Sequence, residues 1–444
     1  MERSSTPQSS RLLLRLALAV ADCKYPDPQG SRRVQTKGAE ERSEEKGRDA
    51  EEQSDALPEG AWERLENLRF RFGSELSFAD SCLADDPPSS RIELLLANSS
   101  ELRKVAVLQR FLERAYSLRL QSPGDGLQIS DDIIAWTKND SSPLVSVIRG
   151  RAWMERGNFL RILGDAKGAY ASLEEALQEL ETHGVSDSLE LARYQELLGT
   201  LERDCGNFTA AADLLKKALA KVRRWGDSYS LQRVLIAASI TDVCCNNFEE
   251  AQALLDDSLR IDVPDSLLLR YAAVNKILAY YLSGNPQKAY QALLRVRSGL
   301  GSAWLQGFSE VNRTTILWSE GQMLSALRID DEAVGLLSKA REFFVRSSQG
   351  SKVCHISVDL ALSYVAQQRF GDVRRELAFG LPFCSEESVL DQNAKEALLL
   401  LLGALEHQGR LEGEHVRAVN DRLAFLHRAP LQTLHKRPFA DLRL

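Results

Sequence analysis

Apolar residues recur every three to four positions along most of the chain from about residue 100, a spacing that predicts amphipathic helices. The clearest segment is Arg151 to Leu177, RAWMERGNFLRILGDAKGAYASLEEAL, which reads as two such helices in succession. Gly157 and Ala169 are the small residues at which we expect the two helices to approach closely. Gly164 and Asp165 mark the turn, because glycine adopts the positive φ of a helix C-cap and aspartate caps the next helix.

The same frame recurs, so this segment is one unit of a repeat. Five further turns follow at intervals of 38 to 44 residues, and the last two of them, like the second, lack a glycine. They stand at Gly206-Asn207-Phe208, Asn246-Asn247-Phe248, Gly284-Asn285-Pro286, Arg328-Ile329-Asp330 and Gln368-Arg369-Phe370. This order of bulky, glycine and alanine positions resembles the tetratricopeptide repeat. That repeat has a usual period of about 34 residues, so we expect longer joints between the pairs, such as Ser298 to Phe308.

The resemblance covers about residues 143 to 383 and implies an all-α fold, a right-handed α-α superhelix of about six helical pairs. Between Glu40 and Asp55, eleven of sixteen residues are charged, and such a segment cannot bury enough apolar surface to fold. The predicted organisation is therefore a disordered leader (1–56), a small helical element (57–99), a degenerate first repeat (100–142), the repeat array (143–383), capping helices (384–428) and a tail (429–444).

Two stretches carry a more specific resemblance, GRAWMERGNFLRILGD and AKEALLLLLGALE. They resemble the carboxy-terminal tetratricopeptide arrays of regulatory proteins from Acidobacteria-like bacteria. Some members of that group carry an amino-terminal helix-turn-helix domain, and others accompany sigma-factor regulation. Residues 1 to 99 contain no readable DNA-binding domain, so any transcriptional role implied by the resemblance is indirect.

Composition narrows the function classes. With 56 Lys plus Arg against 63 Asp plus Glu and a net charge of −7, the chain does not bind nucleic acid through bulk charge. No apolar stretch is long enough to predict a membrane span. The apolar run Arg11 to Ala21 contains Arg15 and is followed by Asp22, which argues against a secretory signal. Seven cysteines without a C-x-x-C pair argue against a disulfide framework or zinc ribbon and favour a reducing, cytoplasmic location.

A search for catalytic chemistry finds no phosphate-binding glycine loop, nucleophile elbow or zinc-protease motif. The six histidines include no pair at metal-ligand spacing with a nearby acidic ligand. We therefore expect a non-enzymatic protein without a cofactor or a metal.

The remaining candidate site is the surface formed by the first helix of each pair, which lines the concave groove in tetratricopeptide arrays. The early units place five arginines on that face, and the later units place aromatic residues there. The expected partner-binding groove consists of Arg151, Asn158, Arg161, Arg193, Thr200, Arg203, Arg233, Tyr271, Tyr281, Trp318 and Gln322.

Arginine pairs with carboxylates through its planar guanidinium, and asparagine can hold an extended peptide backbone. The expected partner is a protein or peptide segment with an acidic stretch and bulky apolar anchors, and the expected function is a regulatory interaction scaffold. A peptide- or ligand-gated signalling receptor is the alternative, with an indirect transcriptional regulator as a further one. The oligomeric state is not predicted.

The arginines also have a purely structural interpretation. They can pair with acidic residues of the same or neighbouring helices and only hold the repeats together. Under the groove interpretation the arginines are exposed, so replacing Arg151, Arg161 and Arg193 by Glu is expected to leave the stability unchanged. The structural pairs would be Arg151–Glu155, Arg193–Glu196 and Arg203–Asp204.

Overall fold

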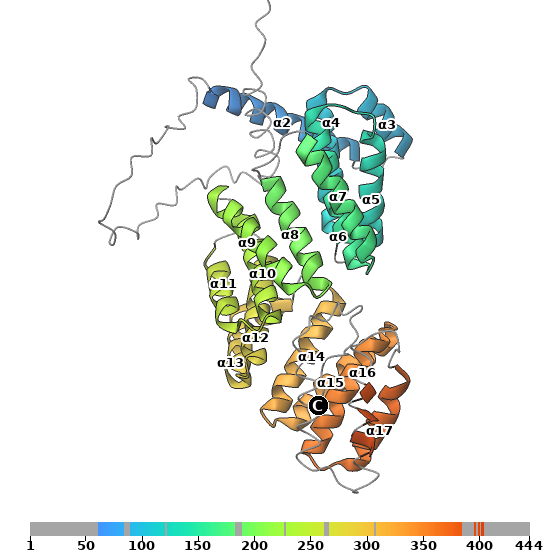
Figure 1. Ribbon diagram of the computed structural model, residues 1–444, viewed down its shortest axis with the longest axis vertical. Coiled ribbons are helices and arrows are strands. Elements are labelled where there is room, and N and C mark those ends of the chain that lie inside the picture. The colour runs from blue at the N-terminus through green and yellow to red at the C-terminus, as the bar shows by residue number, and fades with distance from the viewer. Residues whose placement is uncertain are drawn as a thin grey trace, which may run out of the picture. The chain divides into compact units, whose positions relative to one another are not determined.

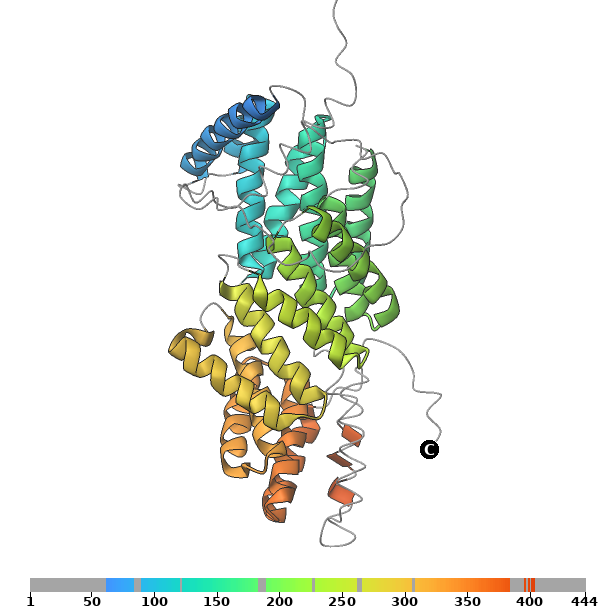
Figure 2. The ribbon, with the colours of Figure 1, turned by 90° about the vertical axis from the view of Figure 1, so that its left-hand side faces the viewer.

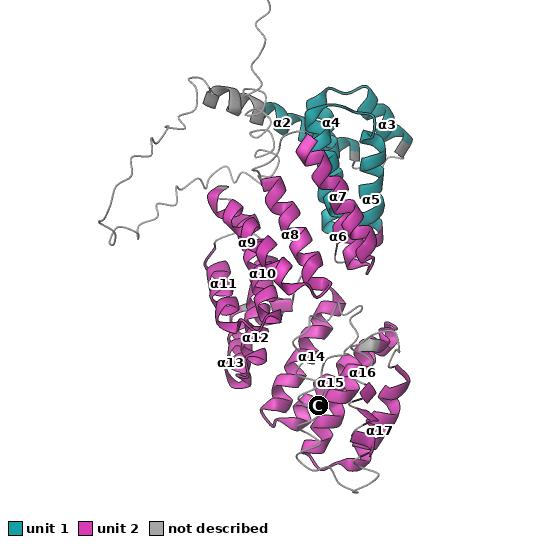
Figure 3. Ribbon diagram, viewed as in Figure 1, with its two compact units in different colours: residues 1–117, 125–155 teal, residues 118–124, 156–444 magenta. Residues whose placement is uncertain are grey.

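A computed structural model describes residues 61–83, 89–119, 122–182, 189–225, 228–261, 266–305, 308–383, 395–396, 398–399 and 401–403. Every regular element in these ranges is a helix. The chain divides into two compact units, residues 1–117 with 125–155 and residues 118–124 with 156–444 (Figure 3). The expected leader and tail, and most of the expected capping region, lie outside the described residues.

Unit 1 packs its helices around one apolar core. Phe72, Ile92, Leu108, Ile133 and Ile148 are all buried in it, one from each contributing helix. The helices are α2 (Ala61–Leu83), α3 (Ser89–Ala97), α4 (Glu101–Leu118), α5 (Pro123–Thr137) and the first part of α6 (Pro143–Ile162).

Unit 2 continues as a regular succession of helix pairs, which lie side by side along the chain (Figures 1 and 2). Each helix contacts the next one in sequence, and the first helix of each pair also contacts the first helix of the following pair from α8 onwards. The elements are α7 (Ala166–Thr182), α8 (Leu189–Asp204), α9 (Phe208–Trp225), α10 (Ser228–Cys244), α11 (Phe248–Arg260), α12 (Ser266–Leu282), α13 (Pro286–Leu300), η1 (Gly301–Leu305), α14 (Glu310–Ala326), α15 (Asp330–Arg346), α16 (Gly350–Ala366), α17 (Phe370–Gly380) and η2 (Leu381–Phe383).

The turns inside the pairs fall where the sequence predicts them, and each contains a residue with positive φ. Asp165 caps α7, because its Oδ1 accepts a hydrogen bond from the Gly168 backbone N–H at 2.8 Å. Two turns use an arginine and a glutamine, which pay a steric cost in this conformation. The φ values are 89° at Gly164, 83° at Gly206, 63° at Asn246, 82° at Gly284, 65° at Arg328 and 57° at Gln368.

Glycines in three of the first helices let the partner helix approach closely. A Cβ on Gly157 would lie 3.1 Å from Leu173 Cγ, and one on Gly321 would lie 2.8 Å from Leu337 Cγ. Gly199 faces Leu215 in the same way. In each case the leucine lies sixteen residues further along the chain. The pair α12–α13 differs, because the same register places Ile277 opposite Leu293.

Candidate functional site

The predicted groove residues all lie on first helices. We call the surface that α8, α10, α12, α14 and α16 share with the end of α6 the first-helix wall. The sites on α6 and α8 are Arg151, Asn158, Arg161, Arg193, Thr200 and Arg203, and those on α10, α12 and α14 are Arg233, Tyr271, Tyr281, Trp318 and Gln322.

A buried carboxylate brings two of the arginines together. Asp204 is 2% exposed. Its Oδ2 accepts a hydrogen bond from Arg161 Nη1, and its Oδ1 accepts from Arg203 Nε at 3.2 Å and Nη2 at 2.9 Å. Arg161 also donates from Nη2 to Asn158 Oδ1 at 3.0 Å. The contact of Arg161 with Asp204 ties α6 to α8. We call Arg161, Arg203 and Asp204 together the Asp204 bridge.

The charge balance of this bridge affects its titration. Burial lowers the pKa of the Arg161 guanidinium, and the positive charge of Arg203 lowers that pKa further, although the attraction of Asp204 opposes both. Two guanidiniums share a single carboxylate, so the three residues together carry one net positive charge.

A second buried carboxylate joins the other two arginines of the wall. Glu196 Oε1 accepts from Arg193 Nη1 at 2.9 Å and from Arg233 Nε at 2.7 Å, so α8 is tied to α10. Burial alone would raise the pKa of Glu196, but the charges of Arg233 and Arg193 and their hydrogen bonds outweigh it. The pKa of Glu196 is therefore lowered, and the carboxylate stays ionised at neutral pH.

These contacts change the expected character of the arginine-rich part of the groove. The groove interpretation treats the arginines as exposed, and this is wrong: Arg203 is 8% exposed, and the side chains of Arg161 and Arg193 are each 15% exposed. Two pairs of the structural interpretation are present, Arg193–Glu196 and Arg203–Asp204. Charge reversal at Arg161 would place two carboxylates side by side, so it would destabilise the fold and could not serve as a neutral test of binding.

Two further predicted residues, Thr200 and Arg151, make no contact with these two buried carboxylate side chains among the described hydrogen bonds. The Thr200 hydroxyl donates to the backbone carbonyl of Glu196 at 2.8 Å, within its own helix. Arg151 belongs to unit 1, where its Nη1 donates to Gln109 Oε1 at 3.2 Å.

The later first helices carry a polar cluster around Asp359 of α16. Trp318 donates from its indole N–H to Asp359 Oδ2 at 2.6 Å, and Gln322 Nε2 donates to the same oxygen at 2.9 Å. Trp318 is only 3% exposed, so it is a packed wall residue and not the open aromatic contact that the sequence predicts. Burial raises the pKa of Tyr281, and the negative charge of Asp359 raises it further.

Tyr271 lies apart from that cluster. Its hydroxyl accepts a hydrogen bond from Asn312 Nδ2 at 3.0 Å, which links α12 to α14. Its ring packs edge-on against Phe308, with 4.6 Å between the ring centroids. Phe308 closes the long joint after α13 that the repeat spacing predicts, so this aromatic contact holds the joint against the wall.

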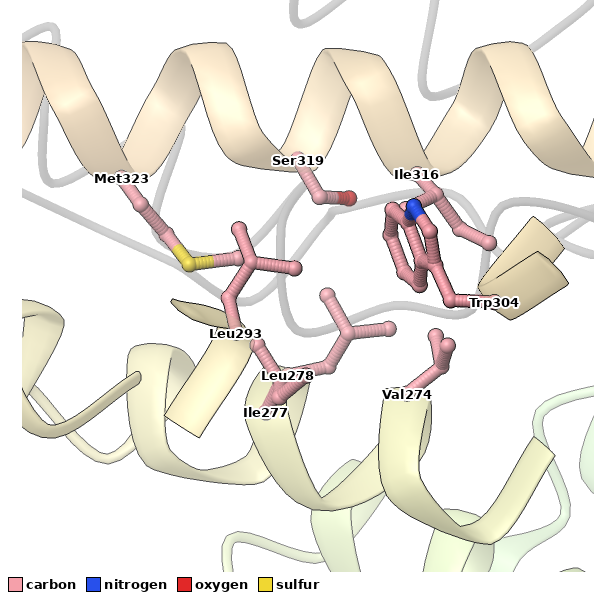
Figure 4. Close-up of a pocket in the computed structure, with 8 residues that line it drawn as sticks. All are labelled: Val274, Ile277, Leu278, Leu293, Trp304, Ile316, Ser319 and Met323. Carbon is pink, nitrogen blue, oxygen red and sulfur yellow. The ribbon is translucent and has the colours of Figure 1, made fainter. Parts of the chain in front are cut away.

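A small apolar cavity lies between α12, α13, η1 and α14, close to the wall (Figure 4). Its volume is about 10 Å³, roughly the room that one water molecule needs. It is therefore a local packing gap and not a preformed pocket for a bulky side chain. The lining residues are Val274, Ile277, Leu278, Leu293, Trp304, Ile316, Ser319 and Met323.

Sequence reasoning missed the carboxylates that organise the wall as part of the site. Glu196, Asp204 and Asp359 are all buried, and only the first two entered the structural interpretation as possible partners. The signal was present, because Glu196 follows Arg193 by three residues on one helix face and Asp204 adjoins Arg203. The contacts to the next pair span one repeat, 43 residues for Arg161 to Asp204 and 37 for Arg233 to Glu196.

Cysteine chemistry differs in part from the expectation. Cys354 in α16 is disulfide-bonded, which the argument for a reducing compartment did not anticipate. Cys82, Cys205, Cys244 and Cys245 are free thiols. Burial raises the pKa of Cys244 to about 12, even though the nearby Arg203 lowers it, so this thiol is protonated at neutral pH.

The described residues also bear on other classes of function. No three His, Cys, Asp or Glu side chains gather there in the manner of metal ligands. Within the same residues, none of the helices combines the length and the apolar character that a membrane crossing requires.

Comparison with known proteins identifies the fold. No protein-family model and no curated protein matches the sequence. Among solved structures, the apo form of RapI matches with 14% identity and a TM-score of 0.52, over 72% of this chain and 86% of that one. A Rap protein complexed with competence and sporulation factor matches with 13% identity and a TM-score of 0.52, over 81% and 95%. The apo quorum sensor NprR from B. thuringiensis matches with 16% identity and a TM-score of 0.52, over 81% and 99%.

These similarities confirm the expected fold class, an all-α array of tetratricopeptide-like helix pairs. At these identities they establish the fold alone. The resemblance to Acidobacteria-like arrays finds no match among them, so it stays a prediction.

Proposed function

We propose that this protein is a non-enzymatic regulatory scaffold that binds a segment of a partner protein or peptide on the first-helix wall. The observation that carries the proposal is the concentration of charged and aromatic side chains on first helices, in a fold that contacts partners through that face. The partner segment is expected to carry an acidic stretch for the arginine-rich end and apolar side chains for the end that contains Tyr271 and Tyr281.

The arginines act in this proposal as fixed, preoriented donors. Because Glu196 and Asp204 hold the guanidiniums in place, little side-chain entropy is lost when a partner binds. The carboxylates also screen the cationic charge, so recognition depends on hydrogen-bond geometry more than on long-range attraction.

Site-specific photo-crosslinking tests the proposal. A benzoylphenylalanine at Thr200 lies on the wall, and the matched control carries it at Lys216, an exposed position on the second helix α9 of the same pair. We expect a partner segment to be captured at Thr200 but not at Lys216. Equal capture at both positions, or none at Thr200, would contradict binding on the wall. Circular dichroism melts check that both variants are folded.

A second candidate function is a signalling receptor whose superhelical pitch changes when a peptide or other ligand binds. It is favoured by the similarity to the quorum sensor NprR and to a Rap protein complexed with competence and sporulation factor. Small-angle scattering with and without the captured segment separates the two functions. A scaffold keeps its radius of gyration, whereas the receptor becomes more compact.

A further inference from the structure

The Asp204 bridge contains hydrogen-bond donors that the protein itself does not use. Arg203 donates to Asp204 from Nε and Nη2. Among the described residues its Nη1 has no acceptor, and it is not one of the completely buried polar atoms without a partner, so it keeps some access to solvent although Arg203 is only 8% exposed. Arg161 donates one hydrogen bond to Asp204 and two to Asn158. An open donor on an otherwise buried guanidinium is a binding point for an anion.

The charge of the bridge limits which anion fits. Both Asp204 oxygens are already occupied, and one carboxylate cannot neutralise two guanidiniums. One additional negative charge makes the cluster neutral. A carboxylate supplies one charge in a planar group that accepts two parallel N–H bonds, whereas a doubly ionised phosphate would leave an excess negative charge in a largely buried site.

We infer that the Asp204 bridge is a recognition site for a single peptide carboxylate, bound by Arg203 with the support of Arg161, and that Asp204 sets its affinity. The inference rests on the proposed function, because it assigns one contact of the partner segment to named atoms. Asp204 here acts as a built-in competitor: it orients both guanidiniums and at the same time offsets half of their charge.

Short peptides test this inference on the full chain. The probes are acetyl-Gly-Asp-Gly-amide, its neutral analogue with Asn and inorganic phosphate, each titrated at constant ionic strength and followed by ligand-observed NMR. Wild-type protein is expected to bind the Asp peptide at least about tenfold more tightly than the Asn peptide, a difference of about 1.4 kcal/mol.

Three variants assign the preference to the bridge. Arg203→Gln is expected to abolish the preference for Asp, because the open Nη1 donor is lost. Asp204→Asn is expected to strengthen binding of the Asp peptide about tenfold by removing the competing charge. Arg341→Gln is the matched control, because Arg341 also pairs with a poorly exposed carboxylate, Glu376, but between the second helices α15 and α17; it is expected to keep the wild-type preference.

Several results would overturn the inference. These are equal binding of the Asp and Asn peptides to wild-type protein, no detectable binding of either, retention of the preference in Arg203→Gln, or tighter binding of phosphate than of the Asp peptide. If Asp204→Asn does not fold, the inference is still tested by comparing the preference for the Asp peptide in Arg203→Gln with that in Arg341→Gln. If the peptide experiment gives one of these results while crosslinking at Thr200 is retained, the carboxylate contact is ruled out and the proposed function is not. Loss of that crosslinking removes the proposed function itself.

Discussion

Individual residues of the wall show that a polar position on a repeat helix need not be solvated. Glu196 is 4% exposed and accepts hydrogen bonds from two arginines on different helices. A buried charge is tolerated only while its partners remain, because an unpaired charge in the interior is strongly unfavourable. Stability should therefore depend on each member of these pairs.

Replacing Glu196 by Gln is expected to lower the free energy of unfolding by about 3 kcal/mol, because two guanidiniums lose their shared counter-charge. Urea denaturation measures the change. The control is Glu174→Gln, an exposed position on α7 that is expected to change stability by less than about 0.5 kcal/mol. A loss as small as that of the control would show that the buried pairing is energetically neutral.

The lowered pKa of Glu196 gives this residue a defined pH dependence. A carboxylate with a lowered folded-state pKa contributes its full stabilisation above its ordinary value of 4.5, and the contribution is lost as the pH falls from there through the folded-state pKa. Wild-type protein is thus expected to lose stability more steeply than Glu196→Gln below pH 4.5. Parallel curves for the two proteins, measured by denaturation at a series of pH values, would contradict the assigned shift.

Arg328 is strained by its turn, because its φ of 65° is favourable only for glycine and a few polar residues. Replacing Arg328 by Gly is expected to stabilise the protein by about 1 kcal/mol, whereas Gly206→Ala, at a φ of 83°, is expected to destabilise it by a similar amount. Thermal melts of the two variants should move in opposite directions. A lower melting temperature for Arg328→Gly would mean that the arginine side chain offsets its own strain.

At the scale of elements, the helix pairs depend on small residues at one position. A Cβ on Gly321 would lie 2.8 Å from Leu337 Cγ and 2.9 Å from its Cδ2, so the two helices must separate to admit it. Gly321→Ala is expected to cost about 2 kcal/mol through overpacking. Gly335 on α15 is the control, because a Cβ there meets nothing within 4 Å; Gly335→Ala is expected to stabilise the helix by up to about 1 kcal/mol. Equal effects of the two substitutions would show that α14 and α15 are not in close contact.

Most of these elements could be predicted from the sequence, because helix periodicity and turn residues are local signals. The first-helix face was also predictable, and so were two ion pairs within α8, Arg193–Glu196 and Arg203–Asp204, but the contacts between helices were not. Trp318 and Arg203 fit either an open groove or a packed wall, since the period identifies a face and not its partner. The disulfide at Cys354 was also missed, because the connectivity of cysteines cannot be deduced from the sequence alone.

At the scale of the whole molecule, an array of pairs transmits stability only between neighbours. Gly321→Ala is therefore expected to raise amide hydrogen exchange in α14, α15 and the adjoining pairs, while α4 and α5 of unit 1 keep their wild-type rates. Exchange followed by mass spectrometry checks the pattern. A uniform rise in all helices would instead indicate a single cooperative unit.

Among the pairs from α6 to α17, one has a bulky residue at the position where the helices approach, whereas the others have a glycine, Ser239 or Ala361 there. Ile277 takes that position in α12, faces Leu293 and lines the small cavity beside it. The glycine-bearing pairs approach closely at this position, whereas α12 and α13 have a bulky residue and a small cavity there, so sliding these two helices past each other is expected to break fewer close contacts. If a bound segment winds or unwinds the array, the adjustment should therefore begin at this pair, in the middle of the wall, and leave the two ends to move as stiff pieces.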